Sequence, residues 1–401
     1  MAFISYIRPI RGRGRPLIPL ALVLCIYTFV KFNFSRVDNG RLANFSGEDR
    51  ISGSGASPGA GQNAEPQAAR KEELVFFLIL CEGKPKADQG GKKASDISRQ
   101  IRQSAVMLKS AAALTSTFLR FLVIADSKSL YQQLVDTTSN WPREYQQRLS
   151  FEYHDVWYPP SREKMRNMFR VCATERLFLP DMFPDLDAAI YIDTDLVFLR
   201  PPEDLWAEFR EFNDRQVAAM APCLYHYGSN RNKIPFYGSS GLNAGIMHMN
   251  LTRMKSFPGG GWTPAVMKVF DDFRQKIKLA DQDMLNILFH KHPEKLYELG
   301  CEWNYRMWQC SQGTNMCPQA ATKGVSILHG NALAFVSGAE RKLQAVFDAW
   351  ERHHLGDSLH DLLTSLQKDL SEVSEKRLQS RCAKISNIDA ILTMEFEKHV
   401  K

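Results

Sequence analysis

The sequence predicts an α/β fold with a mixed, mostly parallel sheet flanked by helices. Two apolar runs, LVFFLILC at 74–81 and FLRFLVIA at 118–125, are typical of strands buried on both faces of such a sheet. Between them, residues 97–114 carry apolar side chains at helical spacing. Strands that alternate with helices bind their ligands at the carboxyl ends of the strands, so the functional site is expected there.

The same alternation continues along the chain. The expected elements are a helix starting at 130–135, a strand at 151–156, a helix at 169–179 that ends near Pro180, strands at 189–192, 217–221, 245–249 and 325–328, and a helix beginning at 281. From about residue 341 the leucines recur at helical spacing. This tail predicts amphipathic helices that pack on the domain, with a partner-binding surface as the weaker alternative.

Residues 189–202, AIYIDTDLVFLRPP, contain the clearest candidate for chemistry. The first apolar run brings Asp193 and Asp195 to a strand end with Thr194 between them, and side chains two residues apart share a face. Adjacent carboxylates raise one another's pKa, so a neutralising partner is expected. A hard divalent cation that carries substrate phosphates is such a partner.

Three interpretations of this stretch remain open at this point. It is a strand end with solvated carboxylates, the Asp-x-Asp metal site of a nucleotide-sugar glycosyltransferase, or the nucleophile loop of a haloacid-dehalogenase-type phosphatase. The sequence has no Gly-x-Gly-x-x-Gly and no Gly-Lys-Ser/Thr loop, which argues against a dinucleotide enzyme and a P-loop NTPase.

The N-terminal region predicts a membrane anchor and a stem. Residues 16–34 are mostly apolar, carry no charge before Lys31 and are long enough to span a bilayer. A cleavable signal peptide is the alternative, but no Ala-x-Ala site follows. Four arginines precede the span, which places residues 1–15 in the cytosol and the rest in the lumen of the endoplasmic reticulum or Golgi as a type II protein. Residues 35–73 are rich in Gly, Ser and Ala and predict a flexible stem before a luminal domain at 74–401.

The formal charge of +7 is concentrated at the N-terminus. Six basic residues precede the first acidic residue, Asp38, so the remainder is near +1 and gives no argument for a nucleic-acid partner. The candidate N-glycosylation sites are Asn44 and Asn250, whereas the sequon at Asn33 lies too close to the membrane.

Seven of the eight cysteines follow the predicted anchor, in a compartment where they can pair. Their odd number leaves at least one free. Cys301, Cys310 and Cys317 predict a stapled loop, and zinc is the weaker alternative because no Cys-x-x-Cys spacing occurs. A second loop, between the strands at 217–221 and 245–249, holds Tyr225, His226, Tyr237 and Gly238, and is either a specificity loop or lid or an inert excursion.

Five motifs in order carry a family resemblance. They are YIDTDLVFLRPPEDLW, LNAGIMHMNLTRM, DQDMLNILF, CEWNYR and LHGN, each weak by itself. Together they resemble the family 8 glycosyltransferases of glycogenin type, and within them the glucoside xylosyltransferases, over about residues 74–382. The resemblance implies a GT-A fold, a Rossmann-like domain that binds nucleotide sugars.

The resemblance also implies roles for individual residues. Asp193, Asp195 and His329 would hold Mn²⁺, or alternatively Mg²⁺, which bridges the diphosphate of a UDP-sugar. Arg176, Asp281 and Gln282 would be catalytic, because a divalent ion and Arg176 can stabilise the departing phosphate while Asp281 and Gln282 face the anomeric centre. Further donor contacts would be Cys81, Glu82, Thr194, Asn243, Ala244, Gly245, Gly330 and Asn331.

Family enzymes retain the anomeric configuration, and we favour front-face attack with Asp281 as an assisting base. The sequence departs from the family at two places. Phe335 stands where members often carry a lysine, six residues after the metal-binding histidine. After Cys81 and Glu82 the chain enters a Lys- and Gly-rich insertion at 83–94, which puts the uridine contacts there in doubt.

The resemblance therefore implies transfer of xylose from UDP-xylose to O-linked glucose on the EGF-like repeats of Notch-like proteins, in an α1,3 linkage. A related enzyme that uses UDP-glucose or UDP-galactose is the alternative. In the phosphatase interpretation, Asp271 and Asp272 would serve as the distal acidic pair. This interpretation leaves the DQD and LHGN motifs without roles. A catalytically dead binding protein predicts damage to the aspartates or to His329, and all are present.

Overall fold

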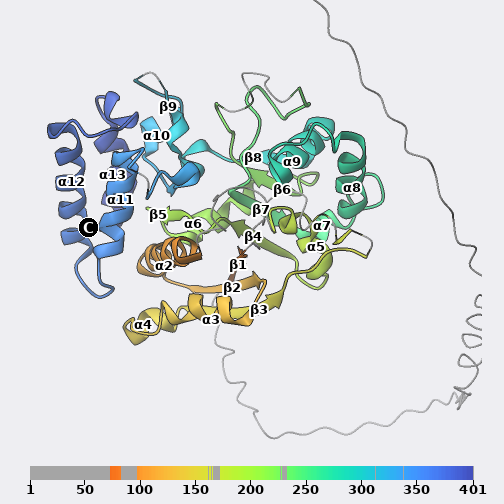
Figure 1. Ribbon diagram of the computed structural model, residues 1–401, viewed down its shortest axis with the longest axis horizontal. Helices are drawn as coiled ribbons and strands as arrows, with labels where there is room; N and C mark the ends of the chain where they lie inside the picture. The colour runs from red at the N-terminus through yellow and green to blue at the C-terminus, as the bar shows by residue number, and fades with distance from the viewer. Residues whose placement is uncertain are drawn as a thin grey trace, which may run out of the picture. The chain divides into compact units, whose positions relative to one another are not determined.

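A seven-stranded mixed sheet forms the centre of the protein (Figure 1). Its strand order is β3-β2-β1-β4-β7-β6-β8, and β7 runs antiparallel to both of its neighbours while the other pairs are parallel. The strands are β1 (Glu73–Leu80), β2 (Phe118–Ala125), β3 (Leu149–Asp155), β4 (Ala188–Ile192), β6 (Ala218–Met220), β7 (Ile246–Asn250) and β8 (Leu296–Glu298). The predicted mostly parallel sheet is confirmed, and β8 is an addition that the sequence did not indicate.

The computed structural model describes residues 73–82, 97–160, 162–163, 165, 172–225, 227, 233–311, 313–336 and 338–400. The predicted cytosolic tail, anchor and stem lie outside these residues, as do Asn33, Asn44, His226 and the insertion at 83–94. Within the described part of the chain, no helix has the length and apolar character needed to cross a membrane.

A smaller antiparallel pair lies beside the main sheet. Strand β5 (Leu196–Phe198) pairs with β11 (Ile327–His329), and His329 lies opposite Leu196 in this register. A hairpin of β9 (Cys310–Ser311) and β10 (Thr314–Asn315) precedes β11. The β5–β11 pairing brings two segments more than a hundred residues apart in sequence to the same place.

Helices flank the sheet and form the C-terminal tail. The α-helices are α2 (Ile97–Leu114), α3 (Lys128–Asp136), α4 (Arg143–Gln146), α5 (Leu179–Met182), α6 (Pro202–Ala207), α7 (Leu251–Met254), α8 (Trp262–Phe273), α9 (Ala280–Lys291), α10 (Pro318–Lys323), α11 (Arg341–Arg352), α12 (Leu359–Glu375) and α13 (Ile388–His399). Short 3₁₀ helices are η3 (Glu175–Phe178), η4 (Glu208–Glu211), η5 (Pro293–Lys295), η6 (Cys301–Asn304), η7 (Met307–Gln309), η8 (Asn331–Leu333) and η9 (Cys382–Lys384).

Both faces of the sheet are buried, as the continuous apolar runs predict. Successive residues of β1 and β4 alternate between two cores: Phe77 and Tyr191 pack with α8 and α9, whereas Phe76 and Ile190 pack with α2. A third core around Trp350 joins α10 to α11, α12 and α13, which lie together in Figure 1. The predicted amphipathic tail is therefore confirmed as part of the domain.

The helix predicted at 169–179 is wrong in extent. The described part, from residue 172, is a turn followed by the 3₁₀ helix η3, and α5 starts only at Leu179, with Pro180 in its first turn. Proline is favoured there because its missing N–H is one that the first turn leaves unpaired anyway, so Pro180 starts a helix instead of ending one.

Three disulfides form, Cys81–Cys172, Cys301–Cys317 and Cys310–Cys382, and Cys223 is the free, buried cysteine. The predicted stapled loop is confirmed in part. Cys301 and Cys317 close it, but Cys310 ties it to the C-terminal region. Disulfide formation also consumes the thiolates that the zinc alternative requires.

Candidate functional site

The candidate site lies at the carboxyl end of β4, near the middle of the main sheet. The Asp193 N–H donates to the Gly245 carbonyl at 2.8 Å, and the Gly330 N–H donates to the Asp195 carbonyl at 2.7 Å. The backbone that carries both aspartates is thus held from two sides, by the segment before β7 and by the segment after β11. Such support holds in place the short connection between β4 and β5 that carries the carboxylates.

The structure brings His329 to the two aspartates. Its Nε2 atom lies 3.3 Å from Asp195 Oδ1 and 3.6 Å from Asp193 Oδ2. One ligand atom from each of the three residues lies within 4.8 Å of the others. His329 is buried, whereas the side chains of Asp193 and Asp195 are 27% and 23% exposed, so the carboxylates are open to solvent on one side.

Buried amide groups behind the histidine determine its hydrogen bonding. The Gly245 N–H donates to Asn243 Oδ1 at 3.1 Å, and Asn304 Nδ2 donates to the same oxygen at 2.8 Å. Asn304 Oδ1 then lies 2.8 Å from His329 Nδ1. An amide oxygen can only accept, so Nδ1 carries a hydrogen, and in a neutral ring Nε2 then presents its lone pair to the aspartates.

This arrangement fits a divalent cation. A bare nitrogen lone pair that faces two carboxylates is repelled by them unless a positive charge lies between. Two carboxylate oxygens and one imidazole nitrogen are ligands that suit Mn²⁺, while Mg²⁺ prefers oxygen alone. The donor set therefore fits a metal site, with Asp193, Asp195 and His329 as its protein ligands.

Arg176 connects this cluster to a third carboxylate. Its Nη2 atom lies 3.1 Å from Asp193 Oδ1 and its Nε atom 2.9 Å from Asp281 Oδ2, while Nη1 donates to the Ala244 carbonyl. The guanidinium stacks over the Tyr191 ring at 3.9 Å, and the Tyr191 hydroxyl donates to Asp193 at 2.6 Å. The side chain of Arg176 is 12% exposed, so these contacts hold it in one position.

Burial and charge shift the pKa values of these groups. Burial raises the pKa of Asp281 to about 6, although the Arg176 guanidinium opposes this. Burial alone would lower the pKa of Arg176, but the Asp281 and Asp193 carboxylates outweigh it and the pKa is raised. In the metal-free protein burial would raise the pKa of Asp195, but the charge of a protonated His329 and its hydrogen bond lower it overall. A cation between His329 and Asp195 thus stabilises the Asp195 carboxylate, whereas burial favours the neutral form of Asp281.

Gln282 joins the site through the same buried amides. Its Oε1 accepts from Asn243 Nδ2 at 2.9 Å and from the Ala244 N–H at 3.4 Å, and its Nε2 donates to the Tyr227 hydroxyl at 3.4 Å. The Tyr227 hydroxyl donates in turn to Asp283 at 2.7 Å. Asp283 Oδ2 accepts the N–H groups of residues 278 and 279, so this second aspartate of the DQD motif stabilises the start of α9.

The sequence of this protein matches a known family across its centre. Residues 94–332, more than half of the chain, match Glycosyl transferase family 8. The chain belongs to glycosyl transferase family 8. Two curated relatives of this family 8 chain illustrate the match. Glucoside xylosyltransferase 1 of Danio rerio is 35% identical over 70% of this chain and 71% of its own length. Glucoside xylosyltransferase 1 of Mus musculus is 32% identical over 88% of this chain and 83% of its own.

A solved structure shows the same fold. The galactosyltransferase LgtC, determined with donor and acceptor sugar analogues, superposes with a TM-score of 0.50 over 70% of this chain and 96% of its own, at 15% identity. The family 8 chain therefore has the mixed, mostly parallel sheet of GT-A glycosyltransferases. This assignment removes the basis for the phosphatase interpretation of the two aspartates.

Most of the predicted site residues converge at this sheet edge. Direct contacts, or contacts through one shared partner, join five of them: Asp193, Asp195, His329, Arg176 and Asp281. The Asn243–Gly245 segment and Gln282 border this cluster. Thr194 is half-buried between the aspartates. The Gly330 N–H donates a hydrogen bond to the Asp195 carbonyl. The Asn331 Oδ1 atom is buried and has no hydrogen-bond partner among the described residues.

The predicted uridine contacts lie at the end of β1. The Cys81 sulfur is used in the disulfide with Cys172, so only the backbone and Cβ of Cys81 remain for a ligand. Glu82 is exposed, and its N–H donates to Asp126 at 2.9 Å. Asn250, the predicted glycosylation site, caps α7 by accepting the Arg253 N–H at 2.9 Å.

Phe335, where the resemblance leads us to expect a lysine, packs in an apolar core. Its buried ring stacks on Phe347 with centroids 4.9 Å apart and fills the space above Gly330, where an added Cβ would lie 2.2 Å from the ring. A charged lysine in this apolar core would be costly to bury. Position 335 therefore belongs to the C-terminal core and supplies no cation to the site.

The sequence interpretation missed three residues that shape the site: Asn304, Tyr191 and Tyr227. Asn304 lies in the CEWNYR motif, and Tyr191 lies two residues before Asp193, on the same face of β4. That shared face was the available signal for Tyr191. No local pattern indicates the roles of Asn304 and Tyr227, because their partners are distant in sequence.

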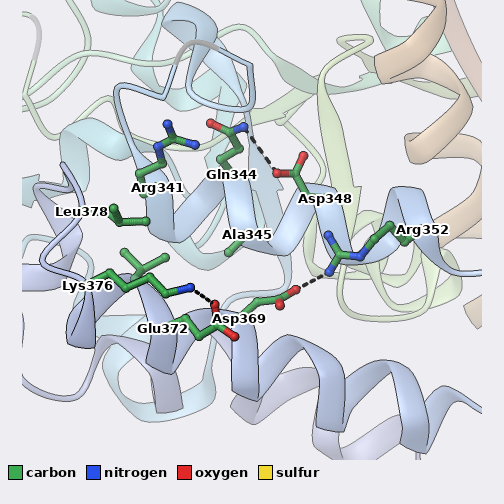
Figure 2. A pocket seen from close by; sticks show the side chains of 10 residues that line it. Arg341, Gln344, Ala345, Asp348, Arg352, Asp369, Glu372, Lys376 and Leu378 are labelled. Carbon is green, nitrogen blue, oxygen red and sulfur yellow. Dashed lines mark hydrogen bonds and ion pairs between the residues drawn. The ribbon is translucent and has the colours of Figure 1, made fainter.

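Two other features lie near the surface. Tyr225, in the loop after β6, is 45% exposed and stacks on Trp308 with ring centroids 5.4 Å apart. A polar pocket of about 190 Å³ lies between α11 and α12 (Figure 2). Two ion pairs line it, Arg352 with Asp369 and Lys376 with Glu372, and it contains no predicted site residue, so we assign it no function.

Proposed function

We propose that this chain is a retaining glycosyltransferase that transfers xylose from UDP-xylose to O-linked glucose on EGF-like repeats, in an α1,3 linkage. The observation that carries the proposal is the cluster of Asp193, Asp195 and His329 beside the Arg176–Asp281 pair, in a chain that belongs to family 8. The names of the curated relatives support xylose as the donor sugar and a glucoside as the acceptor.

The charge of the site suits a diphosphate donor with its cation. Asp193, Asp195 and Asp281 carry three carboxylates, and Arg176 offsets one of them by direct contact. Arg99 adds a weaker attraction that acts on Asp195. The excess negative charge attracts a divalent cation, and we propose Mn²⁺, with Mg²⁺ as the alternative. When bound, the metal would neutralise the diphosphate and the negative charge that develops as UDP departs.

Arg176 is placed to act on the leaving group. Its guanidinium is fixed by Asp193, Asp281 and the Tyr191 ring, so it needs no reorganisation when charge develops on the donor phosphate. A preorganised cation of this kind is more effective than a mobile one, because the cost of ordering it is met during folding. We propose that Arg176 contacts both the donor phosphate and the sugar.

Asp281 and Gln282 begin α9 on the same side of the site. We propose that the Asp281 carboxylate and the Gln282 carbonyl oxygen face the positive charge that develops at the anomeric carbon. Front-face attack lets the departing phosphate take the acceptor proton, so no covalent nucleophile is needed and the configuration is retained. Asp281 is the candidate assisting base, since its pKa of about 6 leaves it ionised at neutral pH.

The other donor contacts and the compartment are also proposals. We assign the donor sugar to the Asn243–Gly245 segment, the phosphates to Gly330 and Asn331, and the uridine to the backbone of Cys81 and Glu82. Three disulfides support an oxidising compartment, which agrees with a luminal catalytic domain in the endoplasmic reticulum or Golgi. The anchor at residues 16–34 and glycosylation of Asn44 and Asn250 remain part of this proposal.

A donor screen tests the function. The full chain is incubated with Mn²⁺, each UDP-sugar and an O-glucosylated EGF-like repeat, with the unglucosylated repeat as the acceptor control. We expect transfer from UDP-xylose to the glucosylated repeat alone, and product NMR should show an α1,3 linkage. Preference for UDP-glucose or UDP-galactose would replace the xylose assignment. Release of phosphate from simple monoesters without sugar transfer would contradict a glycosyltransferase altogether.

A further inference from the structure

We propose that Asn304 is a positioning residue that fixes which ring nitrogen of His329 carries the hydrogen, and so keeps Nε2 free for the metal. The inference rests on the proposed metal-dependent function and deepens it. It concerns a residue that does not touch the metal or the donor but acts through the histidine that does.

A backbone N–H group determines the orientation of the Asn243 amide. The Gly245 N–H can only donate, and it lies 3.1 Å from the terminal Oδ1 of Asn243. If the Asn243 amide were turned over, two donors would face each other. The other end of the same amide confirms this orientation, because Asn243 Nδ2 lies 2.9 Å from Gln282 Oε1, an oxygen that also accepts the Ala244 N–H.

Asn243 then determines the orientation of Asn304. Asn243 Oδ1 accepts, so the Asn304 atom 2.8 Å away must be the Nδ2 donor. Asn304 Oδ1 is thereby turned toward His329 Nδ1 at 2.8 Å, and it can only accept. The hydrogen of a neutral His329 ring therefore belongs on Nδ1, and Nε2 faces Asp193 and Asp195.

The surroundings leave few alternatives. The side chains of Asn243, Asn304 and His329 are all buried, at 6%, 0% and 2% exposure, so water cannot easily replace a lost partner. The backbone also fixes the spacing: the Tyr305 N–H donates to the Ile327 carbonyl, and the His329 N–H donates to the Tyr305 carbonyl. Asn304 is therefore held next to the strand that carries the histidine.

The consequence for the metal is direct. With the hydrogen on Nε2, the ring would point an N–H group at the cation and lose one of three protein ligands. An acceptor on the second ring nitrogen also increases the basicity of the ligating one, and such partners typically change metal affinity about 10- to 100-fold. Asn304 thus links the donor-sugar segment, through Asn243, to the metal ligand.

Three variants separate this role from packing. Asn304→Leu keeps the size but removes the acceptor, and Asn304→Asp keeps an acceptor at Nδ1. Gln309→Met is the matched control, because buried Gln309 bonds to the Asn304 carbonyl but not to its side chain. Mn²⁺ affinity of the full chain is measured from the EPR signal of free Mn²⁺. Thermal unfolding monitors the fold.

We expect the leucine variant to lose Mn²⁺ affinity about tenfold or more, while Gln309→Met stays within about threefold of the wild type. The aspartate variant keeps the acceptor for His329 Nδ1 but loses the donor to Asn243 Oδ1, so its affinity should fall between the two. Equal affinity of the leucine variant and the wild type would overturn the proposal. So would an aspartate variant as weak as the leucine variant, because a lost acceptor could not then be the cause.

A measurement on the wild type does not depend on the folding of any variant. The full chain is labelled with ¹⁵N-histidine and saturated with diamagnetic Mg²⁺, and His329→Gln identifies the signal. We expect the long-range ¹H–¹⁵N pattern of a neutral ring with hydrogen on Nδ1. Hydrogen on Nε2, or on both nitrogens, would refute the inference. Failure of the wild type to bind any divalent ion would instead refute the proposed metal-dependent function.

Discussion

Replacement of Gly245 by alanine tests how closely His329 is packed behind the metal site. Gly245 ends the segment before β7, and the space beside its Cα is filled by the His329 ring. An added Cβ would lie 2.3 Å from His329 Cε1, 2.7 Å from Nδ1 and 3.1 Å from Asn243 Oδ1. The added methyl group would therefore clash with the His329 ring and crowd the Asn243 amide oxygen behind it.

The size of the effect follows from these distances. To reach a tolerable contact of 3.4 Å, the ring or the strand must move by about 1.1 Å, the difference between 3.4 and 2.3 Å. Metal ligands tolerate displacements of only about 0.2 Å from their preferred distances. We therefore expect Mn²⁺ affinity to fall at least as far as on loss of an outer partner, about 10- to 100-fold.

The assay is transfer activity as a function of Mn²⁺ concentration, with thermal unfolding as the measure of stability. Gly259→Ala is the control, because Gly259 is an exposed glycine at φ 96° whose added Cβ meets nothing closer than 3.9 Å. It should cost about 1 to 2 kcal/mol of backbone strain and leave Mn²⁺ dependence unchanged. A Gly245→Ala enzyme with wild-type Mn²⁺ dependence would refute the packing of His329 described above.

Three further predictions address the charges and the acceptor side. Asp195→Asn should abolish both metal dependence and turnover, and near-normal transfer by this variant would contradict the ligand assignment. In metal-free protein, burial raises the pKa of Asp281 from 3.8 to about 6. The folded chain then holds a proton that the unfolded chain has lost, so the free energy of unfolding should fall as pH rises from about 4 to 6, by at most about 3 kcal/mol. Chemical denaturation should show this slope in the wild type and lose it in Asp281→Asn; an unchanged slope would count against the burial of this group. We propose that the loop after β6 is a specificity loop for the acceptor, because the Tyr225 ring is exposed and held against Trp308. Tyr225→Ala should then raise the acceptor KM several-fold with little change in the donor KM, whereas an unchanged acceptor KM would support the inert alternative.

The sheet could be predicted because its signals are local. The runs at 74–81 and 118–125 are apolar at every position or nearly so, and the structure buries both faces of β1. The antiparallel direction of β7 and the presence of β8 have no comparable signal. Pro180 was misinterpreted because proline is tolerated at a helix start as well as beyond a helix end.

The sequence predicts some contacts of the candidate site but not others. The two-residue period of a strand predicts that Asp193 and Asp195 converge, and the structure brings them together in the connection between β4 and β5. His329 reaches the aspartates because β5 pairs with β11. Neither short strand carries a sequence signal for this pairing, so only the family resemblance connected His329 with Asp193 and Asp195. The role of Asn304 depends on hydrogen bonds to two residues 25 and 61 positions away, and these exist only in the folded chain.

Crystals of the full chain grown with Mn²⁺ and UDP, with diffraction measured at the manganese absorption edge, test the central claim directly. The anomalous signal should form a single peak in contact with carboxylate oxygens of Asp193 and Asp195, with Nε2 of His329 and with the diphosphate. A peak that contacts the diphosphate but not His329, or one located elsewhere on the chain, would contradict the metal site on which the proposed chemistry depends.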